Sequence, residues 1–249
     1  DAGGDAVILA DVSTDQDKPS LATADNLTAY LQEKYGVSFE KDLILDSKPV
    51  FDSPLTIVTN DIPTDTSVTQ AFAGVRNSSM IFDVPHPIKI AETLPENVTV
   101  STLVRAGDTT YSKTIDQLIA GDNTQADADP KGPFTLGVMA ENATTGSRVV
   151  LIGSKSVAGN QYAQFLSVNV IDVQFALSSV VWATKFDEFF ATLPSDLQRE
   201  SRPQDAPIFA SASTLTAINL ITVLILPFGT LALGIYVWWT RRARAAKES

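Results

Sequence analysis

The sequence contains no cysteine, which excludes disulfide bonds, thiolate metal sites and cysteine nucleophiles together. Histidine is almost as scarce, since His86 is the single one in 249 residues. One histidine cannot supply a two-histidine metal site, nor a Ser-His-Asp triad with ligands to spare. His86 lies between Pro85 and Pro87, so we interpret it as part of a rigid extended turn. We therefore predict no catalytic, cofactor-binding or metal-binding residues.

Positive charge is in short supply over most of the chain. The formal net charge is −11, while the tail after Thr240 has a net charge of +3 from Arg241, Arg242, Arg244, Lys247 and Glu248. The first 240 residues therefore carry −14, because −11 minus +3 is −14. A surface this acidic repels phosphate backbones and anionic lipid headgroups. We expect no nucleic-acid partner.

The remaining composition is that of a folded protein. Hydrophobic residues make up 44% and charged residues 19%, which excludes disorder for the bulk of the chain. The chain begins Asp1-Ala2-Gly3-Gly4, without an initiator methionine or a basic and apolar leader. We expect either that a signal segment has been removed or that this chain starts inside a longer protein.

One long uncharged stretch runs from Ala206 to Thr240. Its apolar part, Ile218 to Trp239, has about 22 residues and would span roughly 33 Å as a helix, against roughly 30 Å for a bilayer core. Amphipathic rings and then arginines mark its end, at Tyr236, Trp238, Trp239, Arg241 and Arg242. This order is typical of the cytoplasmic end of a membrane span. The sequence therefore predicts a linker over 193–212, a transmembrane helix over 213–240 and a cytoplasmic basic tail over 241–249.

Several residues inside the predicted span bear on how it would pack. Pro227 removes one helical hydrogen bond and is expected to kink the helix. Gly229, Thr230 and Gly234 are small, and the pair Thr230 and Gly234 would allow another helix to approach closely. The alternative is that these are ordinary membrane-helix residues. In either case residues 1–192 are predicted to face the extracytoplasmic, periplasmic side of a single-pass membrane protein.

Apolar runs in residues 1–192 predict an α/β domain. A buried strand at Ala6–Ala10 is followed by a helix over Thr23–Tyr35 that stops at Gly36, and then by more strands. Strand, helix, strand in this order is typical of an α/β sheet. We predict a partly parallel sheet with flanking helices and a strand-rich middle, whose other strands are Leu43–Leu45, Leu55–Val58, Ser79–Phe82, Ile88–Ile90, Val98–Arg105, Phe134–Ala140 and Arg148–Ile152. Two more helices are expected, at Tyr111–Ala120 and Gln161–Trp182.

Several stretches, in order along the chain, resemble one protein family, the membrane-anchored auxiliary component of the gliding-motility-type ABC transport system. The stretches are Gly3–Leu9 before Asp11, Leu31–Val37 leading to Leu45-Asp46, Thr102–Arg105, Gly132–Val138, Arg148–Ser154, and Leu226–Gly234 with Trp238-Trp239 and Arg241-Arg242. The resemblance implies an extracytoplasmic α/β domain beside a multi-span permease and a cytoplasmic ATPase. It carries over no catalytic residues.

This sequence departs from the family pattern at two places. Relatives have a further strand and helix region before the Gly3-Gly4 turn, so the resemblance implies that the first half of the sheet is missing here. A histidine expected near Asn60–Pro63 is also missing.

Two kinds of motif are compatible with chemistry, and each also has a structural interpretation. Gly153-Ser154-Lys155-Ser156 follows a strand, as a nucleophile or phosphate-binding turn would. It lacks the second glycine of a nucleophile elbow and the ending of a P-loop, so we interpret it as a strand-to-helix turn. Two aspartate groups could offer oxygen ligands to calcium, and since neither has the EF-hand spacing we interpret both as solvated loops: Asp122, Asp127 and Asp129, and Asp11, Asp15 and Asp17.

Four Asn-x-Ser/Thr sequons occur, at Asn26, Asn77, Asn97 and Asn142. They could carry glycans in a host that glycosylates, or they could be coincidental in a chain rich in serine and threonine. Either way they predict surface positions.

These observations favour a non-enzymatic accessory subunit of an ABC-type transport or envelope complex in the cell membrane. Its suspected partners are a permease, an ATPase and the lipid bilayer. Two alternatives remain: a structural or adhesive subunit of another surface assembly, and a membrane-anchored hydrolase, which would need a concave site with converging polar groups.

Overall fold

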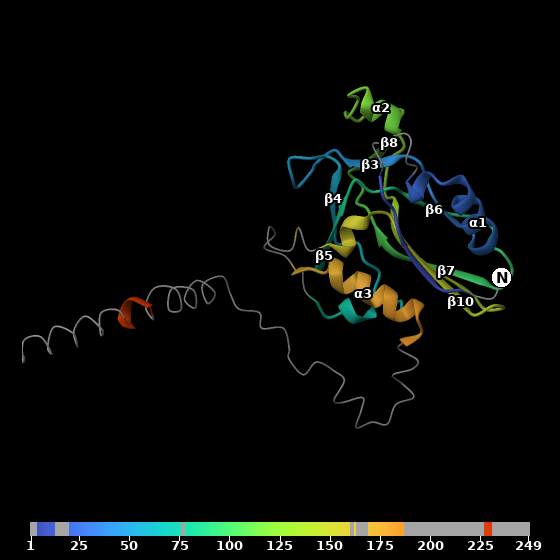
Figure 1. Ribbon diagram of the computed structural model, residues 1–249. Coiled ribbons are helices and arrows are strands. Elements are labelled where there is room, and N and C mark those ends of the chain that lie inside the picture. The colour runs from blue at the N-terminus through green and yellow to red at the C-terminus, as the bar shows by residue number, and fades with distance from the viewer. Residues whose placement is uncertain are drawn as a thin grey trace, which may run out of the picture. The chain divides into compact units, whose positions relative to one another are not determined.

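The computed structural model describes residues 4–12, 20–75, 78–159, 162, 169–186 and 227–230 (Figure 1). The chain divides into two compact units, Asp1–Thr192 and Leu193–Ser249. The first unit contains, in chain order, β1 (Ala6–Leu9), α1 (Asp25–Tyr35), β2 (Val37–Phe39), β3 (Leu43–Asp46), β4 (Thr56–Thr59), β5 (Ser78–Asp83), β6 (Ile88–Ile90), β7 (Val98–Arg105), β8 (Thr110–Lys113), α2 (Ile115–Ile119), β9 (Thr135–Asn142), β10 (Ser147–Ile152), β11 (Asn169–Val170) and α3 (Asp172–Ala183). Short 3-10 helices lie at Leu21–Thr23 (η1), Gln70–Phe72 (η2) and Lys155–Ala158 (η3).

The largest sheet has four strands in the order β1-β10-β9-β7. β1 runs parallel to β10, with Ala6 opposite Val149 and Leu9 opposite Ile152. The other two pairs are antiparallel, and β9 and β10 form a hairpin whose turn has Gly146 in the left-handed region at φ 68°. Every residue of β10 is buried, which makes it the central strand of the domain.

The two faces of this sheet are covered by different helices. Val150 and Ile152 of β10 belong to one apolar cluster with Phe175 and Trp182 of α3. The intervening residues of β10, Val149 and Leu151, belong to a second cluster that includes Leu31 and Tyr35 of α1. Figure 1 shows α1 and α3 on opposite sides of the strands. Each large side chain buried this way contributes roughly 1.5–3 kcal/mol, so both layers stabilise the sheet.

Helix α1 forms and stops where the sequence predicts. Gly36 follows it in the left-handed conformation at φ 67°, and its N–H caps the carbonyls of Gln32 and Leu31. A side chain other than hydrogen is strained at such a φ, which is why a glycine ends the helix. The hydroxyl of Tyr35 donates to Ser147 Oγ at 2.8 Å, which ties the end of α1 to β10.

Three smaller sheets complete the first unit: β11-β5-β4, β2-β6 and β3-β8. Among these, β11 and β5 pair in parallel, while the other pairs are antiparallel. The described strands are short and mostly antiparallel.

The predicted fold class is therefore wrong. The predicted strands and the first helix exist, but the protein is a mixed, strand-rich fold with few helices, and only β1 with β10 and β11 with β5 are parallel among the described strands. The chain leaves α1 into β2, which pairs antiparallel with β6 rather than returning beside β1. Apolar periodicity identifies a strand locally and does not identify its partner, so the α/β interpretation failed at this step.

The predicted transmembrane helix at 213–240 is also corrected. No helix in the described part of the chain is long and apolar enough to cross a membrane. Of the predicted span the structure describes only residues 227–230, a helical turn containing Pro227, Gly229 and Thr230. Hydropathy reports the transfer free energy of side chains and does not by itself establish a continuous helix.

The remaining predicted anchor residues lie outside the described residues: Gly234, Tyr236, Trp238, Trp239, Arg241 and Arg242. Within the described turn, Thr230 Oγ1 donates to the carbonyl of Pro227 at 2.8 Å.

Two other predicted helices are shorter than expected. Over Tyr111–Ala120 the chain first completes β8, which pairs with β3, and only then forms α2 with a capping box between Thr114 and Gln117. In the stretch predicted as a helix from Gln161, the described part contains β11 and then α3.

Candidate functional site

A cavity of about 500 Å³ lies where β1 and β10 end. Because the two strands are parallel, the residues that follow them leave the sheet at the same edge, which is where ligands commonly bind in sheets with parallel strands. Asp11 follows β1 and Ser154 follows β10, and both line the cavity with Asp83 and Lys155. Two motifs that are far apart in the sequence therefore lie side by side.

The serine hydroxyls at this edge are engaged in holding the backbone. Ser154 Oγ donates to the carbonyl of Asp83 at 2.6 Å and accepts from the N–H of Ser156, so it caps η3. Ser156 Oγ accepts from the N–H of Asp83 at 2.9 Å. A nucleophilic serine gives its proton to a base, whereas Ser154 gives it to a carbonyl oxygen. The predicted strand-to-helix turn is confirmed, and its serines join η3 to the end of β5.

The charged groups of the cavity are close to each other. Lys155 Nζ lies 2.6 Å from Asp11 Oδ1, which is within ion-pair distance. The angles between the two groups do not meet those of a hydrogen bond. Both side chains are partly exposed, and such pairs contribute at most about 1 kcal/mol. Asp15 and Asp17, the other members of the predicted aspartate group, lie outside the described residues.

Val84 lines the same cavity in a strained backbone conformation. Its φ is 48°, a region that β-branched residues rarely adopt, and its N–H donates to the carbonyl of Leu55 at 2.8 Å. Such strain costs of order 1–3 kcal/mol and persists only where neighbouring structure imposes it. The cavity wall is therefore held by its surroundings.

The single histidine is a structural group directly behind this edge. His86 is fully buried, and its Nδ1 lies 3.0 Å from the carbonyl oxygens of both Glu40 and Asp42. Since both partners are acceptors, Nδ1 carries the proton. Burial lowers the pKa of His86, and among the described residues nothing hydrogen-bonds to Nε2.

Gly153 explains why a glycine follows β10. Its carbonyl accepts from the N–H of His86 at 2.8 Å, and a Cβ on Gly153 would collide with the carbonyl oxygen of His86. The glycine thus allows the Pro85-His86-Pro87 segment to lie against the end of β10.

The second aspartate group forms ion pairs within the protein. Lys113 of β8 is 1% exposed, and its Nζ lies 2.7 Å from Asp122 and 3.2 Å from Asp129. The carboxylates raise the pKa of Lys113, and the N–H of Ala126 and the lysine lower the pKa of Asp129. Two of the three aspartates therefore fasten the 121–132 loop to β8, a role that the sequence analysis missed because no local pattern marks Lys113.

One buried carboxyl group was also missed. Asp172, the first residue of α3, is 3% exposed and accepts from the N–H of Ile81 at 3.0 Å. Burial raises its pKa from 3.8 to about 7. The available signal was that Asp172 is the single charged residue between Gln161 and Thr184.

Helix α3 also has an apolar surface that the sequence analysis did not single out. Leu177, Val180 and Val181 are all exposed, and Leu177 has 60% of its surface accessible. We call these three residues the outer face of α3. A second cavity of about 300 Å³ lies between Leu177, Val181 and Ala71 of η2. The spacing i, i+3, i+4 places the three side chains on one stripe of the helix.

The sequons differ in their surroundings. Asn26 and Asn97 are exposed, as predicted, while the side chain of Asn142 accepts from the N–H groups of Thr144 and Thr145 in the β9–β10 turn. Asn77 lies outside the described residues.

Comparison with known proteins adds no relative: no family model, no curated protein and no solved structure matches this chain.

Proposed function

We propose that this chain is a non-enzymatic accessory subunit of an extracytoplasmic ABC-type transport or envelope complex in the cell membrane, and that it contacts the permease of that complex through the outer face of α3. The observation that carries the proposal is the apolar, exposed stripe of Leu177, Val180 and Val181. The transport class comes from the sequence resemblance.

The chemistry of this surface defines the partner. Asp172 is the one charged residue of α3 and it is buried, so the outer face of α3 bears no charge on a chain whose net charge is −11. Contiguous exposed apolar side chains are typical of contact surfaces, whose centres are depleted of charge. The adjoining cavity of about 300 Å³ has room for one or two apolar side chains. The partner surface is therefore apolar and uncharged, as an extracytoplasmic helix or loop of a permease can be.

The polar groups at the ends of β1 and β10 have structural partners, which supports a non-enzymatic role in this proposal. Ser154 donates to a main-chain carbonyl, and Lys155 is paired with Asp11. These interactions hold a turn in place and do not activate a nucleophile.

The test is purification of the intact chain from its native membrane in mild detergent. Recovery together with an identified multi-span permease and its ATPase is the expected result. In the variant Leu177→Asp, which places a charge at the centre of the outer face of α3, we expect at least a tenfold loss of the recovered permease. Ile119→Asp is the matched control, because Ile119 is also apolar and 71% exposed but lies at the end of α2.

Recovery of the chain without a permease would overturn the proposal. An identified partner of another kind, such as a surface adhesin or a wall component, would favour a structural subunit instead. Equal loss of the permease in both variants would show that the outer face of α3 is not the contact.

A further inference from the structure

Strand β1 is an edge strand with the side chains of an interior strand. Within the described part of the chain it pairs with β10 alone, yet all four of its residues, Ala6-Val7-Ile8-Leu9, are apolar. Val7 and Leu9 pack against the cluster under α3, and Ala6 and Ile8 pack against the cluster under α1. Strands that are apolar on both faces normally lie inside a sheet, while edge strands usually carry a charge, a proline or a bulge.

The backbone of β1 has hydrogen-bonding groups on its outer side. The N–H of Ala10, just after β1, donates to the carbonyl of Ile152 at 2.8 Å, so this residue points toward β10. Peptide groups alternate along a strand, and therefore Ala6 and Ile8 also point toward β10, whereas Val7 and Leu9 point away from it. The pairing with β10 leaves the N–H and C=O groups of Val7 and Leu9 unused, and all four residues of β1 are only partly buried.

We propose that this edge pairs with the same edge of a second copy of the chain, antiparallel about a two-fold axis, so that the two four-stranded sheets join into one continuous sheet. The geometry of β1 identifies the occupant. An added strand would lie between the two apolar layers that cover β1, so it must be apolar on both faces, and β1 itself meets this requirement.

Charge selects the register of the pairing. Residues that point outward must face each other, so the two-fold axis passes either through Val7 or one residue to either side of it. With Val7 opposite Val7 of the second copy, Asp5 lies opposite Leu9. With Ile8 on the axis, Asp5 would lie opposite Asp11, which like-charge repulsion disfavours. With Ala6 on the axis, Leu9 would lie opposite residue 3 of the second copy, which precedes β1. Fewer apolar residues would then face each other.

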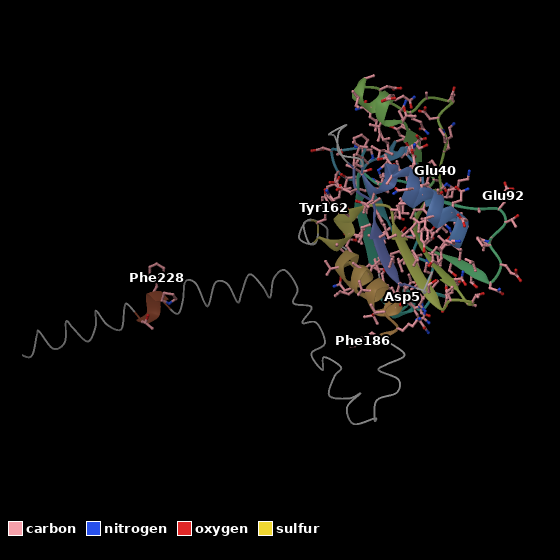
Figure 2. All side chains as sticks on the ribbon, turned by 45° about the vertical axis from the view of Figure 1, so that its right-hand side comes forward. Asp5, Glu40, Glu92, Tyr162, Phe186 and Phe228 are labelled. Carbon is pink, nitrogen blue, oxygen red and sulfur yellow. The ribbon has the colours of Figure 1, made fainter. Side chains whose placement is uncertain are left out.

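The preferred register makes about six backbone hydrogen bonds between the copies, two for each facing pair of outward residues. Figure 2 shows Asp5, at the start of this edge, and Phe186, just after α3, near the same end of the domain. Each copy carries −11, so general repulsion opposes the association and added salt should strengthen it. This salt response is opposite to that of an interface held by ion pairs.

The test is the molar mass of the full-length chain in mild detergent, measured by sedimentation velocity from 1 to 100 µM at low and high salt. We expect twice the chain mass of 26.7 kDa, with the dimer favoured at high salt. Val7→Pro removes an outward N–H that β10 does not use, and we expect it to weaken dimerisation at least tenfold. Val7→Ala is the matched control, because it keeps the N–H although it removes more of the apolar side chain than Val7→Pro does.

Two results would overturn the proposal: a monomer for the natural chain at every concentration and salt level, or a dimer in Val7→Pro as strong as in Val7→Ala. If Val7→Pro does not fold, hydrogen exchange on the natural chain decides. The amides of Val7 and Leu9 should then exchange more slowly as the chain concentration rises, and concentration-independent exchange refutes the pairing. A monomer that acquires a strand from a different polypeptide would also refute it.

Discussion

Changing Asp172 to asparagine removes one buried ionisable group and leaves the shape of the side chain almost unchanged. Burial raises the pKa of Asp172 from 3.8 to about 7. The hydrogen bond from the N–H of Ile81 lowers the pKa and offsets only part of this rise. The folded protein therefore holds a proton on this group that the unfolded chain has released, over the window between about pH 4 and pH 7. Stability is lost as the pH rises through this window, and it stays low above it.

The size of the loss follows from the pKa. At 1.36 kcal/mol for each pKa unit, the rise from 3.8 to about 7 corresponds to about 4 kcal/mol when the group is fully ionised. Part of the loss is already present at pH 5. Between pH 5 and pH 8 the free energy of unfolding of Asp172→Asn, relative to that of the natural chain, should therefore rise by about 2–3 kcal/mol.

The assay is urea unfolding at several pH values, followed by intrinsic tryptophan fluorescence, to which the buried Trp182 of α3 contributes. Asp116→Asn is the control, because Asp116 also lies in the first turn of a helix but is exposed. The control should track the natural chain at every pH. If Asp172→Asn also tracked the natural chain between pH 5 and pH 8, the assignment of Asp172 as a buried, protonated carboxyl would be wrong.

Other substitutions test the rest of the framework. Gly153→Ala should lower the free energy of unfolding by about 1–3 kcal/mol, because the added Cβ meets a main-chain oxygen, whereas Gly74→Ala, with open space around it, should be neutral or stabilising in the same denaturation assay. Lys113→Met leaves two carboxylates without their cation, so limited proteolysis should cut the 121–132 loop faster than in the natural chain; an unchanged cutting rate would argue against the ion pairs. The lowered pKa of His86 predicts that the natural chain loses stability relative to His86→Asn as the pH falls below its ordinary value of 6.5, and a constant difference between the two would contradict a neutral buried imidazole.

Local features of the fold were predictable because their causes lie within a few residues. Gly36 ends α1 through its own left-handed conformation, and turn formers between β9 and β10 make a hairpin. The helix predicted at Tyr111–Ala120 shows the limit of such reasoning. Residues 110–113 are a strand because they pair with β3, which lies far away in the sequence, and that pairing outweighs the local helical preference.

The candidate site shows the same division. The sequence marked Asp11 and the Ser154 turn as polar groups after strands, but their meeting at one cavity depends on β1 lying parallel to β10. Neither the outer face of α3 nor the buried Asp172 was recognised, because burial is set by neighbours such as Ile81 that are distant along the chain.

By itself the sequence determined the absence of cysteine chemistry, the acidic balance of the chain, and the positions of most strands and of α1, since each of these depends on composition or on short-range periodicity. Only the tertiary structure decided which strands pair, which edge of β1 has no partner among the described strands, and which aspartates are exposed, buried or paired with Lys113. These properties depend on the contacts between residues far apart in the chain, and a sequence pattern holds no direct record of them.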